Sequence, residues 1–297
     1  MRIIRYRGRG TEDGIIRLAA VTDQDEAYEL ADADLLAMLD RAERLGLAPA
    51  SLVLRDIEGA EPIARDWREL PLLTPVDAPE VWAAGVTYLR SREARNYEAT
   101  GGKLDASTFY DKVYEAERPE LFMKSTAART AGPGDPVCLR SDSSWQVPEP
   151  ELGIVLDGRG RIAGYTIGND MSCRDIEGEN PLYLPQAKIW KRSCAIGPAV
   201  RLAETVDNPY DLQIACRIYR DNELAVDESA STGQLKRKLE ELVAFLVRDN
   251  EVFPGTVLLT GTCIVPPNQF TLQPGDRIEI DIDGIGTLVN YTEQATA

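Results

Sequence analysis

The chain has 297 residues, of which 43% are hydrophobic and 28% are charged, as is typical of a globular protein that buries a substantial core. Acidic residues outnumber basic residues 49 to 33, and the resulting net charge of −16 repels phosphate backbones and anionic lipids. The charge balance therefore argues against nucleic acid or a membrane as a partner.

The lack of histidine excludes several classes of enzyme. Because no histidine occurs in the chain, no mechanism can use an imidazole of this protein as a base, nucleophile partner or metal ligand. Ser-His-Asp hydrolases, Cys-His hydrolases and nearly all zinc hydrolases are thereby excluded. Any chemistry must rest on carboxylates, lysines, hydroxyls or a bound metal.

Cysteine usage and apolar runs indicate the compartment. The five cysteines are scattered and form no Cys-x-x-Cys pair, which favours reduced thiols over a disulfide framework or a zinc site. The first residues lack the apolar core of a signal peptide. The longest apolar runs, such as residues 242–247, are too short to span a bilayer. We expect a cytoplasmic protein.

Residues 1–72 are predicted to form a small N-terminal α+β domain. Residues 2–7 and 14–22 are typical of short strands, and residues 33–47 have apolar residues at helical spacing with a glycine near the end. Three prolines within residues 71–80 indicate a linker.

From residue 73 to residue 297, strand patterns dominate. Apolar or alternating segments between Gly, Pro and Asp turns predict strands at 81–88, 120–125, 151–157, 162–170, 212–221, 256–262 and 276–290. Only residues 233–248 and 91–100 are predicted to be helical. The predicted fold class is α+β, mostly β, as a rolled sheet or β-sandwich with helices at its edge.

Three carboxylates stand out in the stretch from Ser143 to Asp175. Successive strand residues point to opposite faces, so Glu149 and Glu151 share one face, and Asp170 ends the next predicted strand. Three oxygen ligands suit a hard cation such as Mg²⁺ or Mn²⁺. A solvated strand face and a turn-forming aspartate explain the same residues, and the spacing alone does not decide between these interpretations.

Further candidates are charged residues in apolar surroundings. Lys188 lies in such a segment, although Lys191 beside it is compatible with an ordinary surface lysine. Alternation places Glu120 and Lys124 on one face of a predicted strand, either as a structural ion pair or as a proton-transfer pair.

The ordered set of segments resembles the fumarylacetoacetate hydrolase superfamily over about residues 81–291. The segments that carry the resemblance are "AAGVTY", "ELFMKS", "EPELGIVLD", "GYTIGNDMSCRD", "AKIWKRSCAIGP", "VLLTGT" and "PGDRIEIDIDGIGTLVN". The resemblance implies a mixed β-roll catalytic domain in residues 73–297, a homo-oligomer, and a small-molecule 2-keto acid substrate. It also implies that Glu149, Glu151 and Asp170 hold Mg²⁺ or Mn²⁺, and that the family lysine and threonine correspond to Lys188 and Thr262.

One departure from the family pattern separates hydrolysis from dehydration. The hydrolases have a water-activating histidine at the position of Ser91, and loss of such a base typically costs ~10²–10⁴-fold in rate. The histidine-free segment "TYLRSREAR" looks closest to the 2-keto-3-deoxy-D-arabinonate dehydratase branch. That branch implies conversion of a 2-keto-3-deoxy-pentonate to 2,5-dioxopentanoate in oxidative pentose catabolism.

The dehydratase hypothesis assigns roles to individual residues. Lys188 and Glu120 are the catalytic pair, one as acid and one as base, in an order that the sequence does not fix. The predicted substrate-binding residues are the hydrogen-bonding Thr262, Tyr88 and Ser91 and the cationic Arg90 and Lys124.

Two other functions are compatible with the sequence. One is a hydrolase, decarboxylase or isomerase of acylpyruvate-like 2,4-diketo acids, in which Glu93 replaces the missing histidine. The other is a non-catalytic keto-acid binder or an assembly subunit. Retention of Lys188 and of all three acids argues against the second, since a scaffold has no need of a charged pocket.

Overall fold

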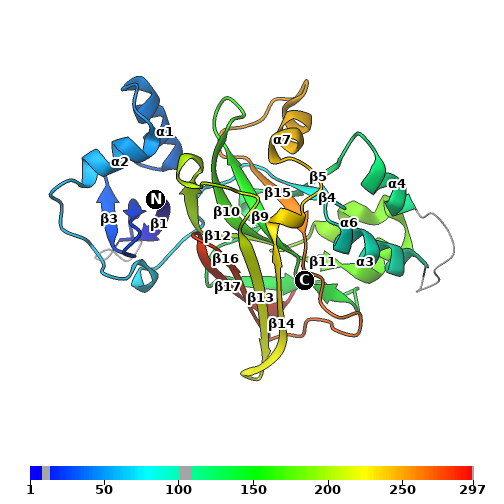
Figure 1. Ribbon diagram of the computed structural model, residues 1–297. Helices are drawn as coiled ribbons and strands as arrows, with labels where there is room; N and C mark the ends of the chain where they lie inside the picture. Colours follow the sequence, from blue (N-terminus) through cyan, green and yellow to red (C-terminus); the bar gives the residue numbers. More distant parts are fainter. Residues whose placement is uncertain (9–13, 101–108, 296–297) are drawn as a thin grey trace.

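A computed structural model describes residues 1–8, 14–100 and 109–295 of the chain, which form two packed β-sheets with helices at their edges (Figure 1). The predicted fold class, α+β and mostly β, is confirmed. Among the described residues, no helix is long and apolar enough to cross a membrane.

The larger sheet has the strand order β3-β2-β1-β12-β10-β9-β15-β4-β5, with β6 paired beside β12. Its strands are β1 (Arg2–Arg7), β2 (Ile16–Val21), β3 (Ala27–Leu30), β4 (Val81–Gly85), β5 (Glu120–Ser125), β6 (Thr130–Ala131), β9 (Pro150–Leu156), β10 (Ile162–Asp170), β12 (Cys194–Leu202) and β15 (Val257–Thr262).

The smaller sheet has the order β14-β13-β16-β17-β7, and β8 and β11 form a short separate pair. These strands are β7 (Pro136–Leu139), β8 (Gln146–Val147), β11 (Ser172–Cys173), β13 (Gln213–Arg220), β14 (Glu223–Ser231), β16 (Arg277–Ile282) and β17 (Gly286–Gln294).

The helices are α1 (Leu35–Arg44), α2 (Pro49–Ile57), α3 (Leu89–Thr100), α4 (Phe109–Glu115), α5 (Arg174–Glu179), α6 (Leu184–Lys188) and α7 (Leu239–Val247). Short 3₁₀ turns lie at Trp67–Glu69, Ala127–Arg129, Pro181–Tyr183, Ala203–Thr205 and Thr232–Gln234.

Strand alternation divides the interior into separate cores. On β9, Leu152, Ile154 and Leu156 face the main core, which also contains the inward residues of β13 and β16. Val155 lies on the other face of β9, in a second core that also contains apolar residues of α1 and α2. Glu149 and Glu151 share the parity of Val155, so the alternation that builds the two cores also turns both acids to one face.

The N-terminal strands continue the larger sheet, because β1 pairs with β12 through Arg2 opposite Arg201 and Ile3 opposite Val200. In Figure 1 the blue N-terminal segment occupies one end of the molecule. The division into domains at residues 72 and 73 stays a prediction.

The predicted helix at 233–248 is shorter than expected, since α7 begins only at Leu239. Residues before that point are held by contacts outside the helix. The Lys236 amide donates to the Thr87 carbonyl at 3.1 Å, and Arg237 donates to the Glu117 carbonyl at 2.7 Å. These contacts compete with the helical pattern that the sequence predicts.

Candidate metal centre

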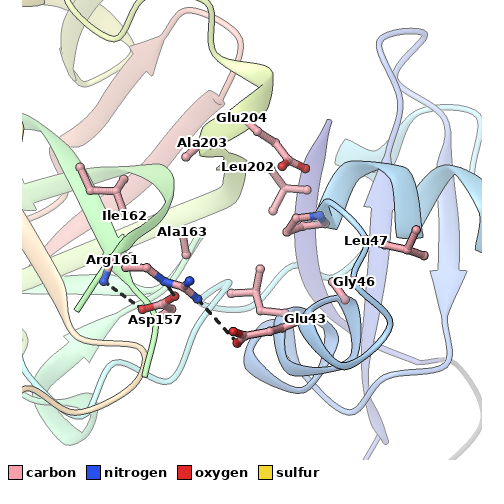
Figure 2. A pocket seen from close by; sticks show the side chains of 13 residues that line it. Glu43, Gly46, Leu47, Asp157, Arg161, Ile162, Ala163, Leu202, Ala203 and Glu204 are labelled. Atoms are coloured by element: carbon pink, nitrogen blue, oxygen red, sulfur yellow. Dashed lines mark hydrogen bonds and ion pairs between the residues drawn. The ribbon is translucent and has the colours of Figure 1, made fainter. Parts of the chain in front are cut away.

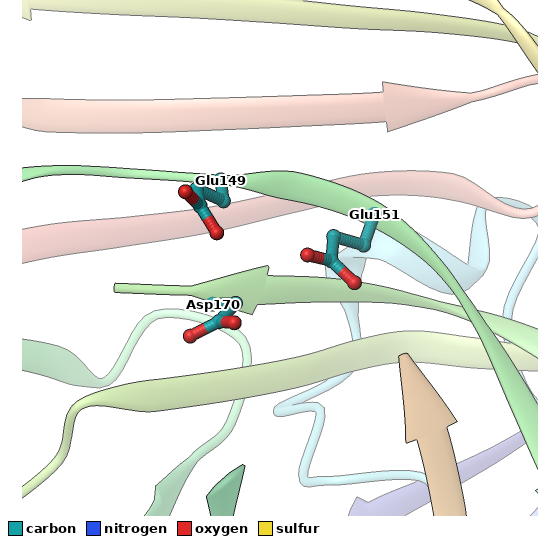
Figure 3. Close-up of side chains that lie close together, drawn as sticks. All are labelled: Glu149, Glu151 and Asp170. Atoms are coloured by element: carbon teal, nitrogen blue, oxygen red, sulfur yellow. The ribbon is translucent and has the colours of Figure 1, made fainter. Parts of the chain in front are cut away.

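Three buried carboxylates converge at the ends of β9 and β10. Glu149 directly precedes β9, Glu151 lies within it, and Asp170 is the last residue of β10. The Asp170 amide donates to the Glu149 carbonyl at 3.0 Å, which sets the register of the two strand ends. One oxygen of each side chain lies within 4.8 Å of the others, and Figure 3 shows the carboxylates pointing toward one another. The structure therefore brings the three predicted ligands together.

Two of the three carboxylates are paired with fixed cations. Glu149 is 2.6 Å from Lys188 Nζ through one oxygen and 2.6 Å from Arg174 Nη2 through the other. Burial raises the pKa of Glu149, but the charges of Lys188 and Arg174 outweigh burial and hold that pKa well below its ordinary value. Asp170 pairs with Lys124 at 2.7 Å and with Lys188 at 3.3 Å.

Glu151 is different, because in the described part of the chain it forms no ion pair with lysine or arginine. Its Oε2 accepts a hydrogen bond from the Gly261 amide at 2.6 Å. Burial, followed by the charges of Asp170 and Glu149, raises the pKa of Glu151 well above its ordinary value. A buried carboxyl that is surrounded by carboxylates and lacks a cation partner fits a site for a hard divalent cation.

Lys188 is fully buried at the end of the short helix α6. Its ammonium donates to Glu149 Oε2 at 2.6 Å, to Ser172 Oγ at 2.6 Å and to Asp170 Oδ2 at 3.3 Å. Burial lowers the pKa of Lys188, but Asp170, Glu149 and Glu177 outweigh it and keep the pKa above its ordinary value. These contacts favour the protonated form of Lys188.

One face of β5 turns toward the site, as the alternation predicts. Glu120 lies against Gly85, where a Cβ atom would approach its Oε2 to 2.0 Å. That oxygen is buried and has no hydrogen-bond partner in the described part of the chain. Burial raises the pKa of Glu120 above its ordinary value. Phe122, two residues on, has its ring centre 5.6 Å from Lys188 Nζ.

A cavity of about 10 Å³, room for roughly one water molecule, joins these groups. It is lined by all three carboxylates, Lys188 and Phe122, by Ala84, Gly85 and Val86 at the end of β4, by Gly261 and Thr262 at the end of β15, and by Ser91 and Arg95 from α3. Glu120 does not line it directly but contacts Gly85, which does.

The five predicted substrate-binding residues form three groups according to where they lie relative to the cavity. Thr262 and Ser91 reach the cavity, although Ser91 Oγ also donates to the Tyr88 carbonyl at 2.9 Å. Tyr88 and Lys124 are buried but do not line the cavity. Arg90 is exposed outside it. The structure thus brings two of these five residues to the cavity.

Sequence reasoning missed three charged residues around the carboxylates. Arg95, which is 4% exposed, pairs with Glu177 Oε1 at 2.7 Å. The third missed residue is Arg174, which pairs with Glu149. Arg95 follows Ser91 by four residues, so helical spacing places both on one face of α3. That spacing is the signal that would have selected Arg95 instead of Arg90.

A larger cavity of about 480 Å³ shares no lining residue with the carboxylate site (Figure 2). It lies between α1 and the turn that joins β9 to β10. Its main charged groups are already paired, since Arg161 is 2.7 Å from Asp157 and 3.7 Å from Glu43. The carboxylate cavity is therefore the stronger candidate for chemistry.

The family of the chain follows from comparison with known proteins. A family model described as "Fumarylacetoacetate (FAA) hydrolase C-terminal" matches residues 91–292. The chain therefore belongs to the fumarylacetoacetate hydrolase family, which confirms the resemblance of the sequence.

Particular relatives and a solved structure sharpen this placement. A probable 2-keto-3-deoxyxylonate dehydratase of Haloferax volcanii is 47% identical over 279 residues, which cover 92% of this chain and 94% of the relative. A 2-dehydro-3-deoxy-D-arabinonate dehydratase of Saccharolobus solfataricus is 46% identical over 74% of each chain. A structure of 2-keto-3-deoxy-D-arabinonate dehydratase complexed with magnesium and 2,5-dioxopentanoate matches over the full length of both chains, with a TM-score of 0.81 and 36% identity.

Proposed function

We propose that this protein is a Mg²⁺-dependent dehydratase that converts a 2-keto-3-deoxy-pentonate to 2,5-dioxopentanoate. The observation that carries the proposal is the buried cavity in which three carboxylates converge beside Lys188, without any histidine. The dehydratases that are 46–47% identical to the chain support the same reaction.

Glu149, Glu151 and Asp170 are the proposed metal ligands. A divalent cation bound there supplies Lewis-acid polarisation of the substrate's 2-keto oxygen, which makes the C3 protons more acidic. The ligand set contains only oxygen atoms, as Mg²⁺ prefers, and Mn²⁺ is the expected substitute.

Glu120 and Lys188 divide the proton transfers. Glu120 is the proposed base for the C3 proton, because its buried Oε2 lies against Gly85 at the cavity wall and accepts no hydrogen bond from a described residue. Burial also raises its pKa above the ordinary value. Lys188, held in its protonated form, is the proposed acid that donates to the C4 hydroxyl, which then leaves as water. The resulting enone tautomerises to the C5 aldehyde.

The environment of α3 supports dehydration over hydrolysis. Glu93, the predicted substitute for the missing histidine, is exposed and does not line the cavity. Ser91, at the histidine position, donates to the Tyr88 carbonyl instead of to a neighbouring acid. Neither residue is placed to activate water at a carbonyl of a bound diketo acid.

Thr262 and Ser91 remain the proposed hydrogen-bonding residues for the substrate, because both line the cavity. We also propose that the protein is a cytoplasmic homo-oligomer. A place in pentose catabolism is in keeping with the names of its dehydratase relatives.

A product assay on metal-stripped protein tests the reaction. Protein with and without added Mg²⁺ receives 2-keto-3-deoxy-arabinonate in one set of reactions and an acylpyruvate in another. We expect a 2,5-dioxo acid from the sugar acid only when Mg²⁺ is present. Release of pyruvate from the acylpyruvate, without aldehyde from the sugar acid, would overturn the proposal in favour of a hydrolase.

A further inference from the structure

Lys124 is a buried cation whose contacts all lie within the protein. Its side chain is fully buried, and its ammonium is 2.7 Å from Asp170 Oδ1. The same group donates to the Met171 carbonyl at 2.7 Å and makes a short hydrogen bond to the Lys188 carbonyl. Two of the three N–H groups of the ammonium therefore bind backbone carbonyls, and its charge is paired with Asp170.

The partners of Lys124 come from the ends of two elements, which the ion pair between Lys188 and Asp170 also joins. Asp170 is the last residue of β10, and Lys188 is the last residue of α6. Because α6 has only five residues, it is too short to hold its own end in place without tertiary contacts. Lys124 reaches both ends from β5, and the Trp190 ring centre lies 5.0 Å from its ammonium.

We propose that Lys124 is a positioning residue that fixes the Asp170 carboxylate relative to the end of α6, and therefore relative to the Lys188 ammonium. One of its contacts is with a proposed metal ligand and another is with the backbone of the proposed acid. The inference rests on the proposed function only where kcat and KM are measured, because those assays use the proposed dehydration.

This assignment replaces the prediction that Lys124 holds the substrate carboxylate. Lys124 does not line the cavity, and its ammonium already binds two backbone carbonyls and pairs with Asp170. The two roles differ in what they control. A substrate contact changes KM, whereas a positioning contact changes the affinity for the cation and kcat.

The test compares Lys124→Met and Lys124→Gln with wild-type protein and with Lys191→Met, which alters an exposed lysine nearby. Mg²⁺ binding to metal-stripped protein is measured by calorimetry without substrate, and kcat, KM and the melting temperature are measured separately. Loss of a group that orients a metal ligand typically costs 10- to 100-fold in affinity or activity, so we expect a rise of ~10- to 100-fold in the Kd for Mg²⁺ in Lys124→Met.

We expect kcat to fall in the same variant while KM at saturating Mg²⁺ stays near the wild-type value. Lys124→Gln keeps two N–H donors, so we expect smaller changes in kcat and in the Kd for Mg²⁺, and a higher melting temperature, than in Lys124→Met. Lys191→Met is expected to behave like wild type.

Either of two outcomes would overturn the inference. A higher KM with unchanged Mg²⁺ affinity would assign Lys124 to the substrate, and a lower melting temperature with unchanged Kd and kcat would make it purely structural. Because the calorimetry uses no substrate, it stands even if wild-type protein fails to dehydrate the sugar acid, an outcome that would contradict only the proposed function.

Discussion

The two sides of the cavity are built from different kinds of structure. Strands β9 and β10 supply the carboxylates, whereas helix α3 supplies Ser91 and Arg95. Side chains on the strands alternate between two faces, so the apolar residues of β9 determine where its acids point. On a helix, neighbouring residues point in directions about 100° apart, so the inward face depends on what packs against it. For α3 that partner includes Glu177, far along the chain.

The largest loss of kcat should come from substitution of the carboxylates that the strands supply. Glu149→Gln removes one proposed metal ligand while keeping the side-chain shape, and we expect kcat to fall by about 10³-fold or more, as loss of several kcal/mol of Lewis-acid stabilisation implies. Calorimetry should show weakened Mg²⁺ binding, and circular dichroism should show a retained fold. Glu228→Gln, on the exposed face of β14, is the matched control. Full activity of Glu149→Gln would contradict a role of the strand carboxylates in the mechanism.

Glu120→Gln should give the next largest effect, and it should separate proton transfer from metal binding. Removal of a general base typically costs ~10²–10⁴-fold in kcat, whereas Mg²⁺ affinity should stay unchanged because Glu120 lies outside the carboxylate triad. An equal loss of Mg²⁺ affinity would instead place Glu120 among the groups that hold the cation.

The pH dependence of the same variant follows from the raised pKa of Glu120. Wild-type kcat should fall as the pH drops through that pKa, which lies above the ordinary glutamate value of about 4.3, and Glu120→Gln should lack this acidic limb. Because the folded protein favours the protonated carboxyl, the stability that Glu120 contributes is present at low pH and lost as the pH rises through its raised pKa. Glu120→Gln should therefore melt no lower than wild type at alkaline pH. Thermal melts across pH, read beside kcat, check both statements.

Gly261→Ala should have a smaller and more specific effect on the strand side. Gly261 has φ +94°, and a Cβ atom there would lie 1.9 Å from Thr87 Oγ1, so either the Thr87 side chain or the amide that orients Glu151 must shift. Gly275 is a matched control, because it has φ +92° and nothing within 4 Å. Both substitutions should cost about 1–2 kcal/mol of stability from the left-handed backbone.

Only Gly261→Ala should also weaken Mg²⁺ binding, by ~10-fold, as expected for a disturbed ligand orientation. Calorimetry on the two variants measures this difference. Equal affinities would mean that the Gly261 amide does not orient Glu151.

The smallest effects should come from the outward face of α3. Arg90→Met and Glu93→Gln alter exposed residues outside the cavity, so kcat and KM should stay close to the wild-type values. Steady-state kinetics on both variants check this expectation. A large loss of kcat in Glu93→Gln would restore the hydrolase alternative, in which Glu93 acts as the base.

The same contrast explains how much could be predicted from the sequence. Strands such as β9, β10 and β16, the shared face of Glu149 and Glu151, and the inward face of β5 follow from alternation between apolar and polar residues. The convergence of Asp170 with the two glutamates is implied only by the family resemblance. Burial of Lys188 could be suspected from its apolar neighbours. The position of Arg90, the start of α7 and the contacts of Lys124 could not, because each depends on partners that are distant in sequence. Lys124, for example, is held by the ends of β10 and α6.

The central claim is that the strand carboxylates form the cation site, and anomalous diffraction from Mn²⁺-soaked crystals tests it most directly. Mn²⁺ takes the same oxygen ligands as Mg²⁺ and gives a signal that identifies its position. We predict one strong peak in contact with carboxylate oxygens of Glu149, Glu151 and Asp170. A fully occupied Mn²⁺ elsewhere, with no peak between these three residues, would contradict the account.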